Sequence, residues 1–373
     1  MRIALDARYG LLANRRGIGV SIHALLEQWR DMEPRGLEFL AFVDGRFDPA
    51  LARAFADSVV RIEPLLTHPF ALWEQWAFPT AAARSRADLI HAMANVGPWS
   101  APVPLVVSIY DVIEWHRGRD FPSHLSWRHR LSRAYRMRAM VKNARDASAV
   151  LTISEHAAQD IRETLRVAPD KLHVIPLGFS TRPGGDDATA LEEMGLGPRS
   201  YAMAFGALDP RKNSDMLLRL WASRSMPWDL VMVGLEPRAL ATLQSRYGTH
   251  RRIHLRGFES DARVQSLLRH AAVFLYPSFY EGFGLPILEA MAVGVPVILS
   301  SGTAGEEVAR NQAIAVPAAD GAAWEHAVRQ LAGHPALWEA RSQAGPRVAA
   351  QYSWRHAAER TLDVYRNLGG RTA

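Results

Sequence analysis

The sequence contains no cysteine among its 373 residues. Disulfides, thiolate metal sites and cysteine nucleophiles are therefore excluded. It also lacks any run near the roughly 18 consecutive apolar residues that a membrane-spanning helix needs. The apolar stretch at the N-terminus is too short for the core of a signal peptide. We therefore expect a cytoplasmic protein, either soluble or bound to the inner face of the cytoplasmic membrane.

The composition is that of a folded chain with more than one domain. Hydrophobic residues make up 48% and charged residues 22% of the sequence, which separates it from disordered chains. A length of 373 residues suits two domains with separate cores. The net charge of +6 favours anionic partners, although arginines spread over a solvated surface would give the same balance.

Short apolar runs alternate with helical patterns along the chain. Continuous apolar strands flanked by helices predict parallel sheets covered on both faces, and two such series predict two doubly wound α/β domains. Ligands of such sheets bind beyond the carboxyl ends of the strands, so we expect a site in the cleft between the domains. The predicted strands are 3–5, 39–43, 59–62, 89–91, 105–109, 149–153, 173–176, 201–205, 230–233, 253–255, 273–276, 295–299 and 313–316.

Proline, paired glycines and paired acids mark a break between the two series, near 182–187. This break predicts an N-terminal domain over 1–182, a linker over 183–198 and a C-terminal domain over 199–350. The last segment, 351–373, has apolar residues at helical spacing and predicts a closing helix.

The most informative segment is 276–292, which follows an apolar strand and leads into a helix. Gly282 and Gly284 permit a tight loop that approaches a ligand closely. Pro286 suits a first helical turn, and the amides at a helix start attract phosphate. Glu281 lies in the loop and Glu289 on the helix, so the two acids are expected to contact different parts of one ligand. A glycine-rich turn with two solvent-facing acids is the plainer alternative.

This segment resembles glycosyltransferase family 4, whose hallmark is two glutamates eight positions apart around a Glu-Gly-Phe-Gly-Leu-Pro loop. The resemblance is strong over 201–308 and loose before it. It implies a GT-B fold of two Rossmann-like domains, with 351–373 crossing back to the N-terminal domain, and a retaining transfer. It implies that Glu289 binds the ribose hydroxyls of the donor and that Glu281 lies beside the donor sugar. Four residues between them are implied donor contacts: Gly282, Phe283, Gly284 and Leu285.

A strand followed by Gly206, with Arg211 and Lys212 shortly after it, can deliver two cations to a diphosphate. Taken alone, this pattern is typical of surface charge at the start of a helix. The family has the same glycine and Arg-Lys-Asn sequence, and there the cations neutralise the leaving nucleotide. The resemblance therefore implies a reaction without a metal or other cofactor, in which Arg211, Lys212 and the helix start supply the positive charge.

Two further pairs of residues are candidates in the N-terminal half. Gly17 and Gly19 do not complete a dinucleotide-binding fingerprint, because Ile22 stands at the third glycine position. In the family a Gly-Ile-Gly loop approaches the donor diphosphate and the acceptor. Tyr110 and Asp111 stand where relatives usually have His-Asp. Tyr110 can hydrogen-bond a sugar but is not cationic near neutral pH, and Asp111 is interpreted as a structural cap in preference to an acceptor contact.

The segment 127–145 carries seven Arg and Lys residues, no acid and several interleaved apolar residues. A basic amphipathic helix with an aromatic start is typical of proteins that bind anionic membrane surfaces. A packed helix with a solvated arginine face is an equal alternative. Nucleic acid is not an expected partner, because no recognised binding module is present.

The sequence is therefore interpreted as a hexosyltransferase that uses a nucleotide diphosphate sugar in the assembly of surface polysaccharides, such as lipopolysaccharide or exopolysaccharide. The expected acceptor is a saccharide or a lipid-linked saccharide, and GDP-mannose is the first donor to test because similar relatives use it. Two alternatives stay open. One is a GT-B sugar-nucleotide epimerase, and the other is a silent nucleotide-sugar-binding partner, which the tyrosine at position 110 suggests.

Overall fold

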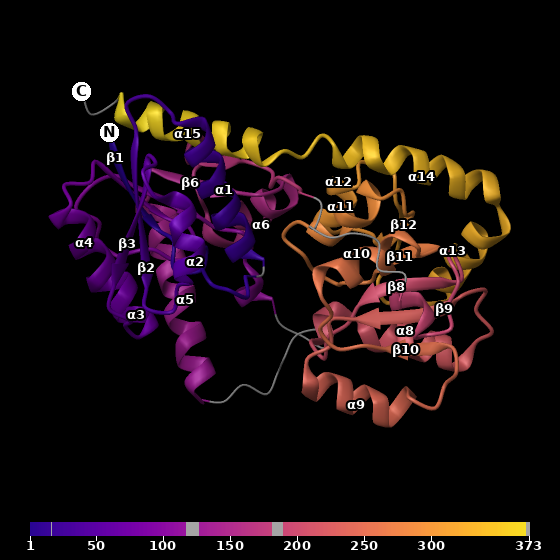
Figure 1. Ribbon diagram of the computed structural model, residues 1–373. Helices are drawn as coiled ribbons and strands as arrows, with labels where there is room; N and C mark the ends of the chain where they lie inside the picture. Colours follow the sequence, from indigo (N-terminus) through magenta and orange to yellow (C-terminus); the bar gives the residue numbers. More distant parts are fainter. Residues whose placement is uncertain (16, 117–126, 181–188, 371–373) are drawn as a thin grey trace. The chain divides into compact units, whose positions relative to one another are not determined.

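The computed structural model describes residues 1–15, 17–116, 127–180 and 189–370 (Figure 1). The chain divides into two compact units. Of the described residues, the N-terminal unit contains those within 1–115, 127–178 and 353–370, and the C-terminal unit contains His116 and those within 179–352. The first residues of the predicted linker, 183–188, lie outside the described residues.

The N-terminal unit is built on a seven-stranded sheet in the order β3-β2-β1-β4-β5-β6-β7, in which every pair is parallel. Its strands are β1 (Arg2–Asp6), β2 (Glu38–Asp44), β3 (Val60–Leu65), β4 (Leu89–Ala92), β5 (Leu105–Ser108), β6 (Ala149–Thr152) and β7 (Leu172–Val174). Its helices are α1 (Ile18–Met32), α2 (Pro49–Ala52), η1 (Arg53–Phe55), α3 (Phe70–Leu72), η2 (Trp73–Ala77), α4 (Phe78–Arg84), η3 (Ile113–Trp115), α5 (Trp127–Asp146), α6 (Glu155–Leu165), η4 (Pro169–Lys171) and α15 (Trp354–Gly369).

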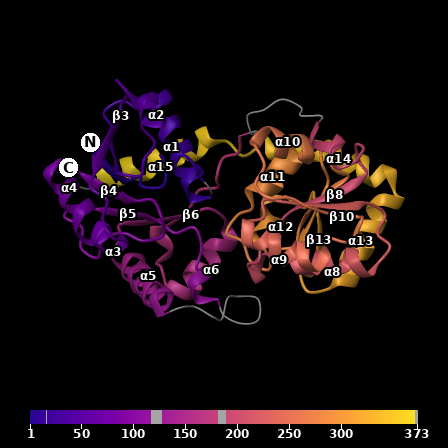
Figure 2. The same ribbon diagram turned by 60° about the horizontal axis from the view of Figure 1, so that its bottom comes forward.

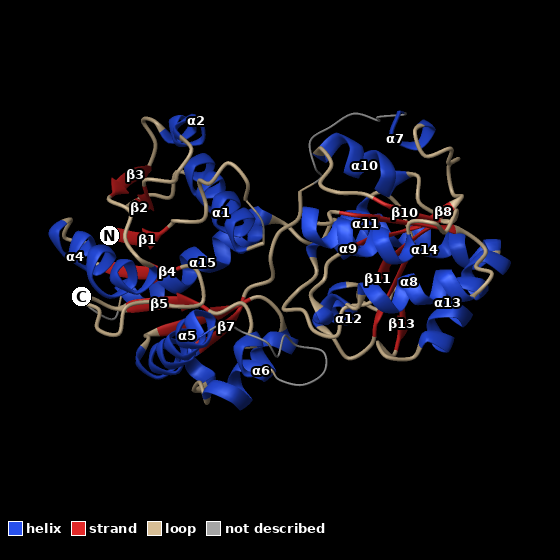
Figure 3. Cartoon of the chain, turned by 90° about the horizontal axis from the view of Figure 1, so that it is seen from below, coloured by secondary structure: helices blue, strands red, loops and turns tan. Residues whose placement is uncertain are grey.

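Helices cover both faces of this sheet, as continuous apolar strands require. One face packs against η2, α4, α5 and α6 through a buried apolar cluster. On the other face Trp29 of α1 stacks on Phe39 of β2, with ring centroids 4.8 Å apart. Helix α15 packs beside α1 on that second face, although the two helices lie near opposite ends of the sequence (Figure 3).

The C-terminal unit is built on a second parallel sheet of six strands, in the order β10-β9-β8-β11-β12-β13. Its strands are β8 (Tyr201–Phe205), β9 (Asp229–Val233), β10 (Ile253–Leu255), β11 (Val273–Tyr276), β12 (Val297–Ser300) and β13 (Ile314–Val316). Its helices are α7 (Thr189–Glu192), η5 (Pro210–Lys212), α8 (Ser214–Ser223), α9 (Pro237–Tyr247), α10 (Asp261–Arg269), α11 (Leu285–Ala292), α12 (Ala304–Val308), α13 (Gly321–Gly333) and α14 (Pro335–Ala349).

Each predicted strand overlaps an observed one, and the prediction of two parallel, doubly wound sheets is confirmed. The buried cluster of the second sheet joins α8, α9 and α13 to one face. Helices α10, α11, α12 and α14 lie on the other side, where α11 packs closely along α14. Both sheets reverse their strand order once, between β1 and β4 and between β8 and β11.

Helix α15 is fixed to the N-terminal unit by buried polar contacts. The His91 imidazole lies between the Tyr365 hydroxyl, 2.5 Å from Nδ1, and the Ser108 hydroxyl, 2.8 Å from Nε2. Complete burial lowers the pKa of His91 to about 3, so the ring bridges β4, β5 and α15 as a neutral group. The Trp29 indole donates to the Ala358 carbonyl at 3.4 Å.

A buried charged cluster lies at the carboxyl end of β1. The Arg8 guanidinium donates to Asp6 at 2.8 and 2.9 Å and to Glu74 at 2.9 Å, and all three side chains are 3% exposed or less. The Tyr135 hydroxyl of α5 donates to the second Glu74 oxygen at 2.8 Å. Burial raises the pKa of Glu74 to about 7 against the opposing effect of Arg8. The cluster thus joins η2 and α5 to the end of β1.

The chain passes from the N-terminal unit to the C-terminal unit after Gly178 and returns before Ser353. Gly178 lies in close contact with Trp354. An added Cβ at Gly178 would lie 2.1 Å from the Trp354 backbone nitrogen and 2.3 Å from its Cα. No L-amino acid with a side chain fits there without a backbone shift. Next to this contact, the Phe179 amide donates to the Tyr352 carbonyl at 3.1 Å.

We expect Gly178→Ala to lower the free energy of unfolding by about 3 kcal/mol, because backbone atoms would have to move to accommodate the methyl group. Gly333→Ala is the matched control, since nothing lies within 4 Å of its added Cβ, and it should be neutral or slightly stabilising. The midpoint of urea denaturation measures both. An unchanged midpoint for Gly178→Ala would show that the close approach is not required.

Candidate active site

The loops that carry the predicted donor residues follow the two central strands of the second sheet. β8 and β11 are neighbours although β9 and β10 lie between them in sequence. In an open α/β sheet, the loops beyond such a reversal of strand order form the usual ligand site. The first loop, 206–213, follows β8, and the second, 277–284, follows β11. The strand order therefore brings these loops together.

Hydrogen bonds clamp the two loops to each other. The Phe279 amide donates to the Arg211 carbonyl at 2.8 Å. The Asn213 side-chain amide donates to the carbonyls of Pro277, at 3.2 Å, and Ala318, at 2.8 Å. Asn213 has φ of 54°, a left-handed conformation that asparagine tolerates better than most residues. The clamp fixes where the side chains of Arg211 and Lys212 leave the backbone.

An ion pair joins the two loops at the site. Lys212 Nζ lies 2.5 Å from Glu281 Oε1, and the two side chains are 31% and 13% exposed. The same Nζ lies 5.8 Å from the centre of the Tyr276 ring. Partial burial strengthens such a pair over a surface one. The structure therefore brings a carboxylate and an ammonium group together within reach of solvent.

Tyr276 is a site residue that sequence reasoning missed. Its ring is buried, and its hydroxyl is hydrogen-bonded to Glu281. The pKa of Tyr276 is raised well above its ordinary value, first by burial and then by the charges of Glu281 and Glu289, while Arg211 opposes the rise. All four side chains therefore act on one small region. A tyrosine at the end of an apolar strand is usually a core residue. Only its position directly before the glycine-rich loop indicates a role in the site.

Arg211 is oriented by a neighbouring acid. The Asp209 carboxylate accepts from the Arg211 amide at 3.0 Å and from Arg211 Nη2 at 3.2 Å. Asp209 is the N-cap of η5, so the bond also fixes the start of the turn that carries Arg211 and Lys212. The Arg211 guanidinium is 19% exposed.

Helix α11 begins directly after the second loop and presents its positive end there. Gly284, its N-cap, has φ of 115°, and an added Cβ would lie 2.8 Å from Ile287 Cδ1. The cap has no side-chain hydrogen bond and the first turn has no acid, so neither compensates the partial positive charge of the helix start. Leu285 and Glu289 are half-buried and lie four residues apart on one side of α11.

Two of the predicted donor residues have packing roles. An added Cβ at Gly206 would lie 2.5 Å from Met232 Cγ, so the glycine permits close packing against β9. The Phe283 ring is 4% exposed and lies edge-on against Tyr352, with centroids 5.7 Å apart. A donor contact at these residues would come from the backbone. Gly282 is partly exposed in the same loop.

The predicted glycines of the N-terminal unit form the start of α1. Gly17 is its N-cap with φ of 47°, and open space surrounds its added Cβ. An added Cβ at Gly19 would lie 2.6 Å from the Tyr9 carbonyl oxygen. Gly19 is therefore needed for close packing of the helix on the chain after β1, whereas Gly17 is needed for its left-handed conformation.

Tyr110 and Asp111 follow β5 in the same unit. Tyr110 is 7% exposed, and its hydroxyl is hydrogen-bonded to Ser21 of α1. Burial raises the pKa of Tyr110. The Asp111 carboxylate accepts from the Ile113 amide at 3.1 Å and starts η3. Tyr110 thus connects the end of β5 to the first turns of α1, and Asp111 supports the turn that follows.

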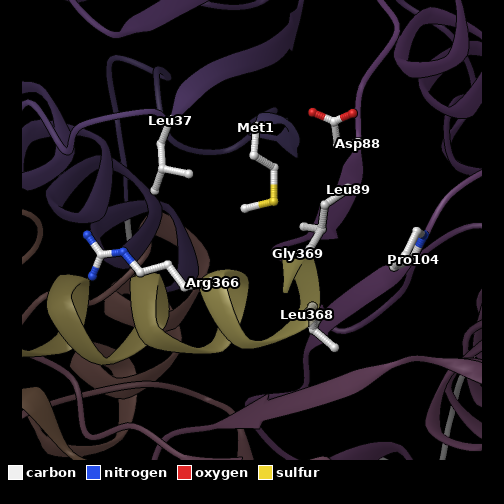
Figure 4. A pocket seen from close by; sticks show the side chains of 8 residues that line it. All are labelled: Met1, Leu37, Asp88, Leu89, Pro104, Arg366, Leu368 and Gly369. Carbon is white, nitrogen blue, oxygen red and sulfur yellow. The ribbon is translucent and has the colours of Figure 1, made fainter. Parts of the chain in front are cut away.

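Cavities also lie outside this group of residues. A cavity of about 340 Å³ is lined by Met1, Asp88, Pro104 and Arg366, among others (Figure 4). It lies where strands of the first sheet begin, the edge opposite to that at which such sheets bind ligands. A larger cavity, of about 620 Å³, adjoins the first loop and reaches Arg246 of α9. Its lining includes neither Lys212 nor the two glutamates.

Comparison with known families supports one interpretation of the two loops and α11. Residues 15–182 match the model described as Glycosyltransferase Family 4, and residues 199–334 match the model described as Glycosyl transferases group 1. The second match contains both loops, the ion pair and α11.

Named relatives agree with the family models. The chain is 30% identical over 310 residues to an MMP alpha-(1->4)-mannosyltransferase from Mycolicibacterium hassiacum, covering 79% of this chain and 74% of the relative. It is 29% identical over 245 residues to the O-antigen chain mannosyltransferase B of Escherichia coli, covering 63% of this chain and 64% of the relative. The chain thus spans slightly less than two thirds of the E. coli protein.

Solved structures share the fold at lower identity. A sucrose-phosphate synthase from Thermosynechococcus elongatus matches with a TM-score of 0.76 at 20% identity, with both chains covered completely. WaaG, a glycosyltransferase involved in lipopolysaccharide biosynthesis, matches with a TM-score of 0.71 at 15% identity and covers 98% of this chain and 99% of its own. These matches confirm the predicted GT-B architecture.

The two family models, the relative aligned over most of its length and the paired Rossmann-like sheets lead to the same conclusion. The chain belongs to glycosyltransferase family 4 and has the GT-B fold.

Proposed function

We propose that this enzyme transfers a hexose, with retention of anomeric configuration, from a nucleotide diphosphate sugar to a saccharide or lipid-linked saccharide in surface polysaccharide assembly. The observation that carries the proposal is the Lys212–Glu281 ion pair of 2.5 Å beside Arg211 and the start of α11. This arrangement offers negative charge to a sugar cation and positive charge to its leaving group.

The proposed reaction breaks the bond between the anomeric carbon and the diphosphate oxygen. The leaving diphosphate takes the bonding electrons, and its charge is stabilised by Arg211, Lys212 and the helix start. Glu281 lies 2.5 Å from Lys212 Nζ and would stabilise the positive charge that develops on the sugar. Glu289, on the open side of α11, would accept hydrogen bonds from the ribose hydroxyls. Retention rests on family resemblance.

GDP-mannose is the donor we propose to test first. Its support is that both named relatives are mannosyltransferases. Hydrolysis or transfer of mannose would separate this function from an epimerase, which would change the sugar without releasing it. Binding without turnover would identify a silent binding partner.

We expect one nucleotide sugar from a panel, GDP-mannose first, to raise the thermal midpoint, because a ligand at about 100 times its Kd stabilises the folded state by about 2.7 kcal/mol. Glu289→Ala should lose this shift and the slow hydrolysis of the donor. Glu339→Ala, an exposed acid on α14, should keep both. A panel that stabilises neither the wild type nor the control would contradict a donor site in this unit.

We expect Lys212→Ala to lower kcat/KM by about 10²–10³-fold, because the leaving diphosphate loses a positioned cation. Arg224→Ala is the control: this cation of the same unit is 63% exposed and lies 3.7 Å from its partner Glu325, so its loss should leave the rate unchanged. If the two variants behave alike while both keep the wild-type thermal midpoint, Lys212 has no role in the transfer.

We also propose that transfer needs no metal ion, since Arg211 and Lys212 supply the positive charge at the leaving group. Among the residues that the structure describes, no group of three or more His, Asp or Glu side chains is placed to hold a metal. The rate in excess EDTA should match the rate in buffer alone. A loss of activity that Mg²⁺ or Mn²⁺ restores would reject the proposal.

A lipid-linked acceptor would bring the enzyme to the inner face of the cytoplasmic membrane, and we propose that 127–145 contributes to this contact. Two arginines of this segment have partners within the protein. Arg133 donates to the Glu114 carbonyl, and Arg136 donates to the Glu114 carboxylate at 2.6 Å. These two arginines hold α5 to η3, so the exposed arginines at other positions of α5 are the better candidates.

A further inference from the structure

Next to α5, the surface formed by residues 64–83 has almost no charge. This stretch contains no Lys, Arg or Asp, and its single Glu, Glu74, is fully buried. Leu66, Leu72 and Trp76 are 80%, 52% and 59% exposed. Surfaces of soluble monomers rarely gather such side chains without a partner.

Tyr135 of α5 joins this stretch to two others. Its ring lies edge-on to Phe70, with centroids 6.0 Å apart, and stacks on Trp99 at 5.9 Å. Gln75 donates to the Tyr135 hydroxyl at 2.7 Å and accepts from the Trp99 amide at 2.7 Å. α3 and α5 accordingly lie side by side (Figures 1 and 2). We name the surface of 66–76, Trp99 and 127–131 the docking face.

Exposed apolar side chains concentrate here. The described residues include ten large apolar side chains that are strongly exposed, and seven of them lie in 66–99 or on α5. On α5 the whole first turn, 127–131, is exposed. Beyond it exposed positions recur at intervals of three and four residues along one side of the helix, at Ala134, Arg138, Val141 and Arg145.

The charge on the docking face has one sign. Arg128 and Arg130 are exposed at the start of α5, beside Trp127. The stretches 64–83 and 96–105 contribute no exposed charge. The one acid of α5, Asp146, lies at its far end and pairs with Lys142 at 2.6 Å. Exposed tryptophan and leucine next to arginine, without carboxylates, match the interface of an anionic bilayer.

We propose that the docking face binds the surface of an anionic lipid bilayer, with Leu72, Trp76 and Trp127 entering the headgroup region and Arg128 and Arg130 contacting lipid phosphates. The proposal extends the proposed function, on which it rests for the lipid-linked acceptor. Among the described helices, none is long and apolar enough to cross a membrane.

The docking face is preformed, without a lipid surface. Glu74 and Tyr135, from its two main segments, both bond within the buried Arg8 cluster at the end of β1. Little conformational entropy is therefore lost when the face meets a flat surface. The same cluster ties the face to the edge of the sheet at which the loops of the N-terminal unit begin.

The absence of cysteine makes a direct test simple. Leu72→Cys carries a single environment-sensitive fluorophore on the docking face of the full chain. Val20→Cys, on α1 across the sheet and 37% exposed, carries the same label as a control. With phosphatidylcholine vesicles containing phosphatidylglycerol, we expect a blue shift at position 72 and none at position 20. Pure phosphatidylcholine should give a weaker shift.

The contribution of the arginine charges to vesicle binding is tested by replacing exposed arginines in pairs. Arg128→Gln with Arg130→Gln should weaken binding to phosphatidylglycerol vesicles about thirtyfold, since each basic residue near such a surface contributes about 1 kcal/mol. The control pair is Arg355→Gln with Arg366→Gln, two arginines of α15 that are 64% and 53% exposed, and it should bind like the wild type.

The membrane proposal is overturned if position 72 shows no shift with anionic vesicles, or if both arginine pairs lose binding equally. A shift at position 72 that grows with protein concentration without lipid would instead identify a second copy of the chain as the partner, and would also overturn it. Donor-induced stabilisation, measured on the same variants, is unaffected by these outcomes, so failure of the docking face is distinguishable from failure of the donor site.

Discussion

Every strand of both sheets pairs in parallel with its neighbours, and this pairing brings the loops after the strands to one edge of each sheet. Helices must then return the chain across the faces, which explains why apolar residues run continuously along the strands. Where the strand order reverses, two loops meet without a helix between them. The loops after β8 and β11 meet in this way, and the candidate donor site is the result.

At that edge, hydrogen bonds of the backbone contribute as much to the geometry of the site as the charged side chains do. Asn213 and Phe279 hold the two loops together by backbone and side-chain hydrogen bonds. Only with this clamp does Lys212 reach Glu281 across 69 residues of sequence. The glycines contribute through space and conformation: Gly206 lets two strand ends pack, and Gly284 lets α11 start where its amides face the site.

The N-terminal unit combines buried charge with an exposed apolar surface, the reverse of the usual distribution. Arg8 compensates Asp6 and Glu74 in the interior, and aromatic rings of Tyr9, Phe70 and Trp73 surround its guanidinium. Burying charge is tolerated because each group is hydrogen-bonded. The segments held by this cluster expose leucine and tryptophan side chains to solvent. The proposed bilayer contact gives a reason for that exposure.

The sequence by itself determined the fold class and the donor motif, because both are written in local patterns: apolar runs of strand length, and glycines, proline and two glutamates at fixed spacing around a helix start. Tertiary structure alone decided which charges meet. It placed Tyr276 against Glu281, and it turned Arg133 and Arg136 to Glu114 and not to solvent. The Arg8 cluster could not be predicted either, nor could the addition of 66–76 and Trp99 to the basic helix in the docking face, since these members lie far apart in sequence and come together only through packing on the sheet.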